Sequence, residues 1–175
     1  NKSMNILIFI AIMKSFITNS SLILLPFLWK DVGHNPLYIG IALFLFMFTG
    51  GAGSFISGRV EEKIGAKKVF YISMIATLPI MALFILTYKI YPILSVGIFI
   101  VMGFTTMLAQ PVMIIMAQKI LPDYKSIVSG FINGFAWGVA AIFIAIVGFA
   151  AQTFGITKVL MFISFLPAVC SYFVK

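Results

Sequence analysis

One ionisable side chain, Lys14, falls well inside a long apolar run near the start of the chain. If this run is a membrane helix that rises 1.5 Å per residue, Lys14 lies roughly 15 Å deep, where a charged lysine costs about 2.5–3.5 kcal/mol. Helical spacing places Thr18 and Ser21 on the same face, with Ser15 and Asn19 beside it. The pattern predicts a polar strip that faces a cavity, with Lys14 binding an anionic group of a substrate. Snorkelling of Lys14 to the membrane interface is the alternative.

Polar side chains recur at helical spacing in two later apolar runs. Thr106 and Gln110 share one face of the first, and Ser129, Asn133 and Trp137 follow one another at intervals of four in the second. An asparagine in hydrocarbon needs a hydrogen-bonding partner on another helix or water in a cavity. These residues are therefore candidates to line the same pathway as Lys14. Hydrogen bonding between helices remains an equal alternative.

Small residues form a stripe beside this second polar face. Gly130, Gly134 and Gly138 also recur every four residues and fall on one side of a helix. Such a stripe lets another membrane helix approach closely. We predict that its role is helix packing.

A glycine- and lysine-containing segment, GRVEEKIGAKK, separates two apolar runs at residues 58–68. Its order is a glycine, three residues, an acid, a base, one residue, a second glycine and further bases, carried by Gly58, Glu62, Lys63, Gly65 and Lys67. The acid can interact with a helix N-terminus, and the bases can pair with it or hold the loop at the membrane surface. We predict a gating loop, and a simple orientation signal is the alternative.

The composition excludes most classes of protein. Of 175 residues, 62% are hydrophobic and 9% charged, whereas a soluble domain has about 45–50% and 25%. One cysteine, one histidine and four carboxylates, all outside the apolar runs except Cys170, offer no metal site, no cofactor site and no catalytic constellation. The net charge of +8 lies mostly in short connections, so it predicts topology signals and not nucleic-acid binding. We expect an integral membrane protein that is not an enzyme.

Six apolar runs are each close to the length that crosses a bilayer. They cover residues 5–29, 38–57, 69–88, 93–116, 127–151 and 158–174, and together they make a single six-helix membrane domain over residues 1–175. Alternating barrel strands are absent, so we predict an all-α bundle in contact with lipid. Prolines at positions 26, 79, 111 and 167 predict kinks in or near the ends of these helices.

Basic residues distinguish the two sides of the predicted bundle. Eight lie on one side, namely Lys2, Arg59, Lys63, Lys67, Lys68, Lys119, Lys125 and Lys175, and three on the other, namely Lys30, Lys89 and Lys158. Positively charged connections stay in the cytoplasm. The sequence therefore predicts a multi-pass protein of the plasma (inner) membrane with both termini cytoplasmic.

The segment at residues 58–68 resembles the signature loop of the major facilitator superfamily, G-x-x-x-D-R-x-G-R-K, with Glu62 and Lys63 in place of Asp and Arg. Ala66 replaces an arginine, which weakens the charge relay of that motif. The stretches AQKILP, VSGFINGFAWG and ISFLP resemble the C-terminal half of the fosmidomycin-resistance branch of the superfamily. The resemblance covers nearly the whole chain. It also implies a basic residue at the position of Lys14, which suits an anionic phosphonate drug.

The resemblance implies half of a twelve-helix antiporter, built from two inverted three-helix repeats, that exports a small drug-like or anionic solute in exchange for protons and so confers antibiotic resistance. The partner would be an N-terminal six-helix half that these residues do not contain. The apolar runs hold no carboxylate, so proton coupling would use that other half or Lys14. An importer on the same fold remains open, as does a stand-alone six-helix protein that pairs with a second copy. The substrate and the coupling ion are not readable from the sequence.

Overall fold

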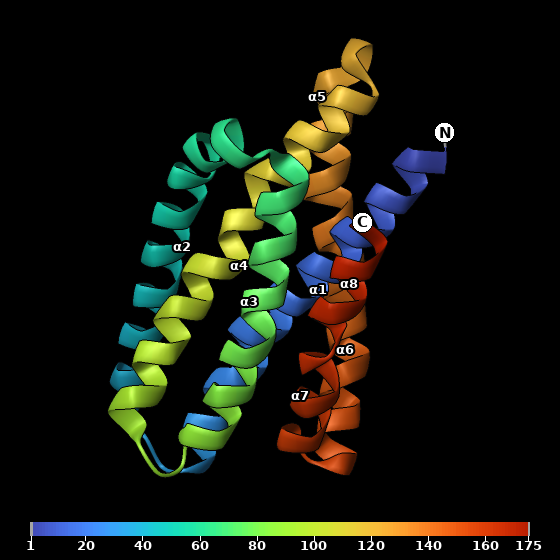
Figure 1. The fold of residues 1–175 in the computed structure, drawn as a ribbon. Helices are drawn as coiled ribbons and strands as arrows, with labels where there is room; N and C mark the ends of the chain where they lie inside the picture. Colours follow the sequence, from blue (N-terminus) through green and yellow to red (C-terminus); the bar gives the residue numbers. More distant parts are fainter. Residues whose placement is uncertain (1, 175) are drawn as a thin grey trace.

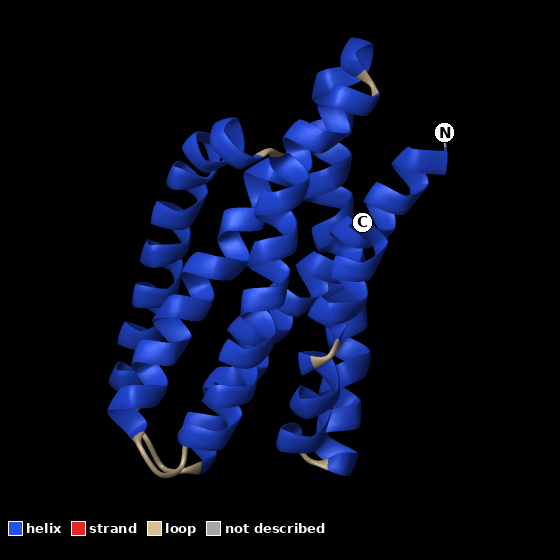
Figure 2. Ribbon diagram, viewed as in Figure 1, coloured by secondary structure: helices blue, strands red, loops and turns tan. Residues whose placement is uncertain are grey.

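The computed structural model describes residues 2–174, and all regular structure in them is helical (Figure 2). In chain order the elements are α1 Lys2–Asp31, α2 Pro36–Ile64, α3 Ala66–Thr87, α4 Pro92–Ile120, the 3₁₀ turn η1 Pro122–Tyr124, α5 Lys125–Gly130, the π-helical segment η2 Phe131–Phe135, α6 Ala136–Phe154, α7 Ile156–Ser164 and α8 Leu166–Val174. Five of the described helical segments are long and apolar enough to cross a membrane, and a shorter apolar helix covers Ile156–Tyr172. The predicted all-α membrane fold is confirmed.

The helices run up and down, so their connections gather at two ends (Figure 1). The start of α1, the α2–α3 junction and the segment around η1 and α5 lie at one end. The α1–α2, α3–α4 and α6–α7 connections lie at the other. This alternation agrees with the two groups of basic residues that the sequence distinguishes.

The second helix is longer than its predicted span of residues 38–57. It begins at Pro36, where the side chain of Asn35 caps it by accepting a hydrogen bond from the Leu37 amide at 2.6 Å, and it continues to Ile64. Only Gly65, at φ 84°, separates it from α3. Glycine enters this left-handed region without the steric cost of a Cβ atom. The predicted loop at residues 58–68 is therefore wrong as a loop, because most of it forms the last turns of α2.

The last predicted span, residues 158–174, is not one continuous helix. It divides into α7 and α8 at Phe165, two residues before Pro167. Proline has no amide hydrogen and disfavours helical geometry in the residue before it. Around the break, the Phe165 amide donates to the Phe162 carbonyl at 3.3 Å, and the Ala168 amide donates to the Phe165 carbonyl at 3.1 Å. These shorter-range bonds replace the α-helical pattern at the break.

Helices α2 and α4 make a very close contact through three glycines that were not among the sequence candidates. A Cβ atom on Gly103 would lie 2.4 Å from the Phe46 carbonyl oxygen, and one on Gly53 would lie 2.6 Å from that of Phe104. Gly50 faces the side chain of Met107 in the same contact. At Gly53 and Gly103 the backbones of the two helices are therefore so close that a larger residue would push the helices apart.

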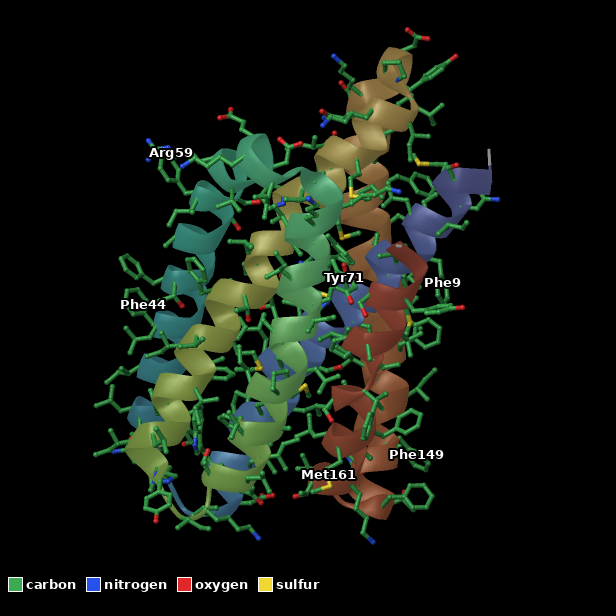
Figure 3. The ribbon with its side chains drawn as sticks, viewed as in Figure 1. Phe9, Phe44, Arg59, Tyr71, Phe149 and Met161 are labelled. Carbon is green, nitrogen blue, oxygen red and sulfur yellow. The ribbon has the colours of Figure 1, made fainter. Side chains whose placement is uncertain are left out.

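The interior contains two apolar clusters, and the outside is also apolar. Trp29 anchors one cluster, where it packs edge-on against Phe84 and Phe99 and donates through Nε1 to the Ser95 hydroxyl at 2.9 Å. On the outside, Phe44 and Phe149 point away from the bundle (Figure 3) and are 65% and 74% exposed. Large exposed apolar side chains of this kind are suited to lipid and not to water.

Candidate functional site

Lys14 is fully buried in the middle of α1, among the helices and not at their ends. Its ammonium group donates a hydrogen bond to Oε1 of Gln110 on α4, 96 positions away in the chain. An ammonium has three hydrogens to donate, and Gln110 is its one hydrogen-bond acceptor among the described residues. The snorkelling alternative does not fit this geometry, because the Lys14 side chain ends on Gln110.

Gln110 also forms a hydrogen bond with Asn133. Its Nε2 donates to Oδ1 of Asn133 at 2.5 Å, so α1, α4 and η2 are joined by two consecutive hydrogen bonds. Gln110 is half-buried and Asn133 is exposed, which means that the chain of bonds leads from a buried cation toward the surface of this chain. Asn133 lies in the π-helical segment, and such segments often occur at functional sites. We call Lys14, Gln110 and Asn133 the polar triad.

No carboxylate neutralises Lys14 in the part of the chain that the structure describes. Asp31 ends α1, Glu61 and Glu62 lie near the end of α2, and Asp123 lies in η1. The one ion pair in that part joins Glu61 to Lys119. The triad therefore contains one buried amine and two uncharged amides, and the protonated form of Lys14 favours an anion.

The polar residues that follow Lys14 in the middle of α1 are buried, but only some lack partners. The hydroxyls of Thr18 and Ser21 donate to carbonyls of their own helix, at 3.1 and 2.8 Å. Ser15 is buried as well. Asn19 Nδ2 and the hydroxyl of Ser20 are buried without a hydrogen-bond partner among the described residues. The residues of the predicted strip are thus buried, and Ser20, which was not a sequence candidate, is a further buried polar residue of this helix. The cavity that the strip would face stays a prediction.

Two other candidate pathway residues lie outside the polar triad. Thr106 is buried and donates to the Met102 carbonyl of its own helix at 2.8 Å. Trp137 is half-buried at the start of α6. Ser129, its companion in the predicted stripe, accepts a hydrogen bond from Gln118 at 2.8 Å and so links α5 to α4. Their part in a pathway stays a prediction.

The glycine stripe has no packing partner within the described part of the chain. A Cβ atom built on Gly130, Gly134 or Gly138 would meet nothing within 4 Å. All three glycines are exposed. A packing role would therefore require a partner surface that the described residues of this chain do not supply.

The predicted gating motif is spread over the end of α2 and the start of α3. Gly58 is half-buried, while Glu62, Lys63, Gly65 and Lys67 are exposed. Neither Glu62 nor Lys63 takes part in the ion pair found among the described residues. The pair is formed instead by the residue before Glu62.

That ion pair joins the end of α2 to the end of α4. Glu61 and Lys119 are 2.9 Å apart, with Glu61 14% and Lys119 67% exposed. Neither residue was among the sequence candidates. The order of residues in the motif pointed to Glu62, and only the relative rotation of the two helices brings Glu61 toward Lys119.

Reversing the charge at position 61 tests the contribution of this pair. In Glu61→Lys we expect a loss of about 1 kcal/mol of stability, because a partly exposed pair is replaced by repulsion from Lys119. The double variant Glu61→Lys/Lys119→Glu is expected to regain most of that loss, as measured by thermal unfolding in detergent. Glu62→Lys is the control, with the same charge change one residue away. An equal loss in the control, or no recovery in the double variant, would contradict the assignment.

No group of three or more His, Cys, Asp or Glu side chains that could hold a metal ion occurs among residues 2–174. Cys170, the chain's one cysteine, is a buried free thiol. The polar triad is therefore the most distinctive polar feature of the membrane-spanning region.

Comparisons with known proteins agree with this architecture. The model of the Major Facilitator Superfamily matches residues 5–174. The chain is 30% identical to the fosmidomycin resistance protein of Escherichia coli K12 over 142 residues, which are 81% of this chain and 34% of that protein. It is 28% identical to an uncharacterized MFS-type transporter, YfnC, of Bacillus subtilis 168 over 125 residues, which are 71% of this chain and 30% of the relative. The matched part thus spans about a third of each relative's length.

Proposed function

Because this chain belongs to the major facilitator superfamily, we propose that it supplies one six-helix half of a secondary transporter that exports a small drug-like or anionic solute in exchange for protons. The family consists of transporters and not of enzymes, and its members cross the membrane several times. The substrate class and the direction are our inference. They rest on the polar triad together with the similarity to a fosmidomycin resistance protein.

The observation that carries the proposal is a fully buried lysine without a carboxylate partner among the described residues. Such a charge is costly in a membrane protein and commonly marks a substrate or ion pathway. With one hydrogen bond made to Gln110, the ammonium of Lys14 retains donors for a ligand. An anionic oxygen would bind there more strongly than the neutral amide oxygen of Gln110, since charge-assisted hydrogen bonds are stronger.

Access to Lys14 would require Gln110 to move. Its amide covers the ammonium on one side and bonds to Asn133 on the other, so a ligand that approaches from Asn133 displaces both contacts. In alternating access, a rearrangement of this kind exposes the same site to each side of the membrane in turn. The proton carrier is then Lys14 itself or a group in the other half, since the described membrane helices carry no carboxylate away from their ends.

The remaining features fit the same arrangement. We place both termini in the cytoplasm of a cell with this half in its plasma membrane, on the strength of the basic residues at one end of the bundle. The exposed stripe of Gly130, Gly134 and Gly138 then packs against the partner half, and the motif between Gly58 and Lys67 acts in gating.

Accumulation of labelled fosmidomycin in cells tests the proposed export. The compound is an anionic phosphonate, and it appears in the name of the E. coli relative. Expression of the protein with every segment that its gene encodes is expected to lower accumulation several-fold, and an uncoupler that removes the proton gradient is expected to restore it. Expression of an unrelated membrane protein at the same level is the control. Unchanged accumulation in both arms would remove this substrate from the proposal.

Two alternatives make different predictions. An importer would raise the accumulation of its solute, and direction is set by gradients and not by the fold. A stand-alone homodimer would require a native gene product no longer than about this chain, whereas a conventional transporter would be about twice as long. The mass of the product in the membranes of its own cells separates these two.

A further inference from the structure

A second site lies at the end of the bundle that holds the α2–α3 junction, away from the polar triad. There a groove of about 480 Å³ opens between the start of α3 and the end of α4. Three of its lining residues are lysines, Lys67 and Lys68 from the first turn of α3 and Lys119 from the last turn of α4. Three cations around one groove make it a basic site.

The rest of the lining is apolar. Ile64, Met116 and Ile120 contribute side chains, and Gly65 and Ala66 complete the wall. Apolar residues of α3 begin at Val69, directly after the lysine pair, so the groove lies where the polar end of the bundle meets its membrane-spanning part. A ligand that fits both parts has an anionic head and an apolar tail.

The charges in the groove are largely unpaired. Lys67 and Lys68 are exposed and form no ion pair among the described residues, while Lys119 forms an ion pair with Glu61 at 2.9 Å. No side chain caps the N-terminus of α3, whose first amide groups lie beside the same lysines. A helix N-terminus favours negative charge and adds to the attraction of the lysines.

We propose that this groove binds an anionic phospholipid, with the phosphate at Lys67, Lys68 and Lys119 and one acyl chain along Met116 and Ile120. Basic pockets between membrane helices are suited to lipid headgroups of this kind. Because Lys67 and Lys68 belong to α3 and Lys119 belongs to α4, a phosphate bound to all three would join the two helices. This binding does not rest on the identity of the transported solute.

Native mass spectrometry of the purified full-length protein tests the proposal directly. Phosphatidylglycerol and phosphatidylcholine with identical acyl chains are titrated onto the wild type, Lys67→Gln/Lys68→Gln and the control Arg59→Gln/Lys125→Gln. The control removes the same charge at the same end of the bundle, from two exposed residues outside the groove. We expect phosphatidylglycerol to bind more tightly than phosphatidylcholine. We also expect the groove variant to weaken it by about fivefold per lysine, and the control to leave it unchanged.

A second variant tests the acyl chain separately. Ile120→Trp fills the apolar part of the groove and leaves every charge in place, so it is expected to weaken phosphatidylglycerol binding while the protein keeps its helical circular dichroism. Equal losses in the groove and control variants would mean general surface attraction and would overturn the site. No preference for phosphatidylglycerol, or displacement of the lipid by inorganic phosphate alone at matched concentration, would overturn it as well.

Discussion

Replacing Lys14 with glutamine is expected to weaken the binding of an anionic solute by about 10- to 100-fold. A hydrogen bond to a charged group contributes about 1.5–3 kcal/mol, and 1.4 kcal/mol corresponds to tenfold in affinity. Glutamine keeps a polar side chain but removes the charge. Concentration-dependent transport of labelled fosmidomycin in cells that carry the complete transporter measures the effect. Unchanged export by the variant would end the proposed role of Lys14.

The variant is expected to fold, because Lys14 makes no ion pair whose loss would leave a charge unbalanced. Removing a lysine from the centre of a membrane helix relieves a cost of about 2.5–3.5 kcal/mol. Thermal stability should therefore stay the same or rise while transport falls. Lys30→Gln is the matched control, since Lys30 is an exposed lysine in the last turn of the same helix. A loss of transport in the control as large as in Lys14→Gln would indicate a general effect of charge.

A variant of Gln110 separates a binding role of Lys14 from a structural one. Gln110→Glu keeps the size of the side chain and places a carboxylate against the ammonium of Lys14. If Lys14 only joins α1 to α4, this change strengthens the contact and leaves transport intact. If Lys14 binds the substrate, the new carboxylate competes with the anion, and transport is expected to fall although the protein is at least as stable.

The sequence identified each member of the polar triad but not their contact. Lys14, Gln110 and Asn133 attract attention singly, because each is a polar residue in an apolar run. Their contact depends on how α1, α4 and η2 rotate against one another over separations of 96 and 23 residues. The π-helical turn adds to the difficulty, since it shifts the register of the polar face after Phe131 and no residue pattern marks it.

The predicted gating motif is a second case in which the sequence does not show which side chains of two helices face each other. Its spacing favoured Glu62, yet Glu61 forms the ion pair. Consecutive residues on an α-helix point about 100° apart, so the extension of α2 through this segment decides which acid faces α4. A segment treated as a loop gives no such information, so the sequence could not show that Glu61 faces Lys119. The gating role of Glu62 stays a prediction.

Glycines illustrate why packing is harder to predict than spacing. The regular stripe from Gly130 to Gly138 drew attention, but within the described residues no atom lies near enough to contact an added Cβ. The close helix contact is instead at Gly50, Gly53 and Gly103, whose spacing follows no simple repeat across two helices. A stripe of small residues indicates that another helix can approach closely, but only the three-dimensional structure shows where the approach occurs.

Gly103→Ala is accordingly expected to destabilise the bundle by about 1–2 kcal/mol. Its new methyl group would lie 2.4 Å from the Phe46 carbonyl oxygen, which is backbone and cannot turn aside, so α2 must move. Overpacking of this kind costs about 1–3 kcal/mol, and alanine regains up to about 1 kcal/mol through its higher helix propensity. The shift in the midpoint of thermal unfolding in detergent, followed by tryptophan fluorescence, measures the difference.

Gly97→Ala is the control, because Gly97 lies on the same helix and an added Cβ there meets nothing within 4 Å. It gains the helix propensity without the clash, so its melting temperature is expected to rise while that of Gly103→Ala falls. Because both variants make the same chemical change in one helix, opposite signs can arise only from what each methyl group meets. Two shifts of the same sign and size would mean that α2 and α4 do not make this close contact, and Gly103 would then be an ordinary helix glycine.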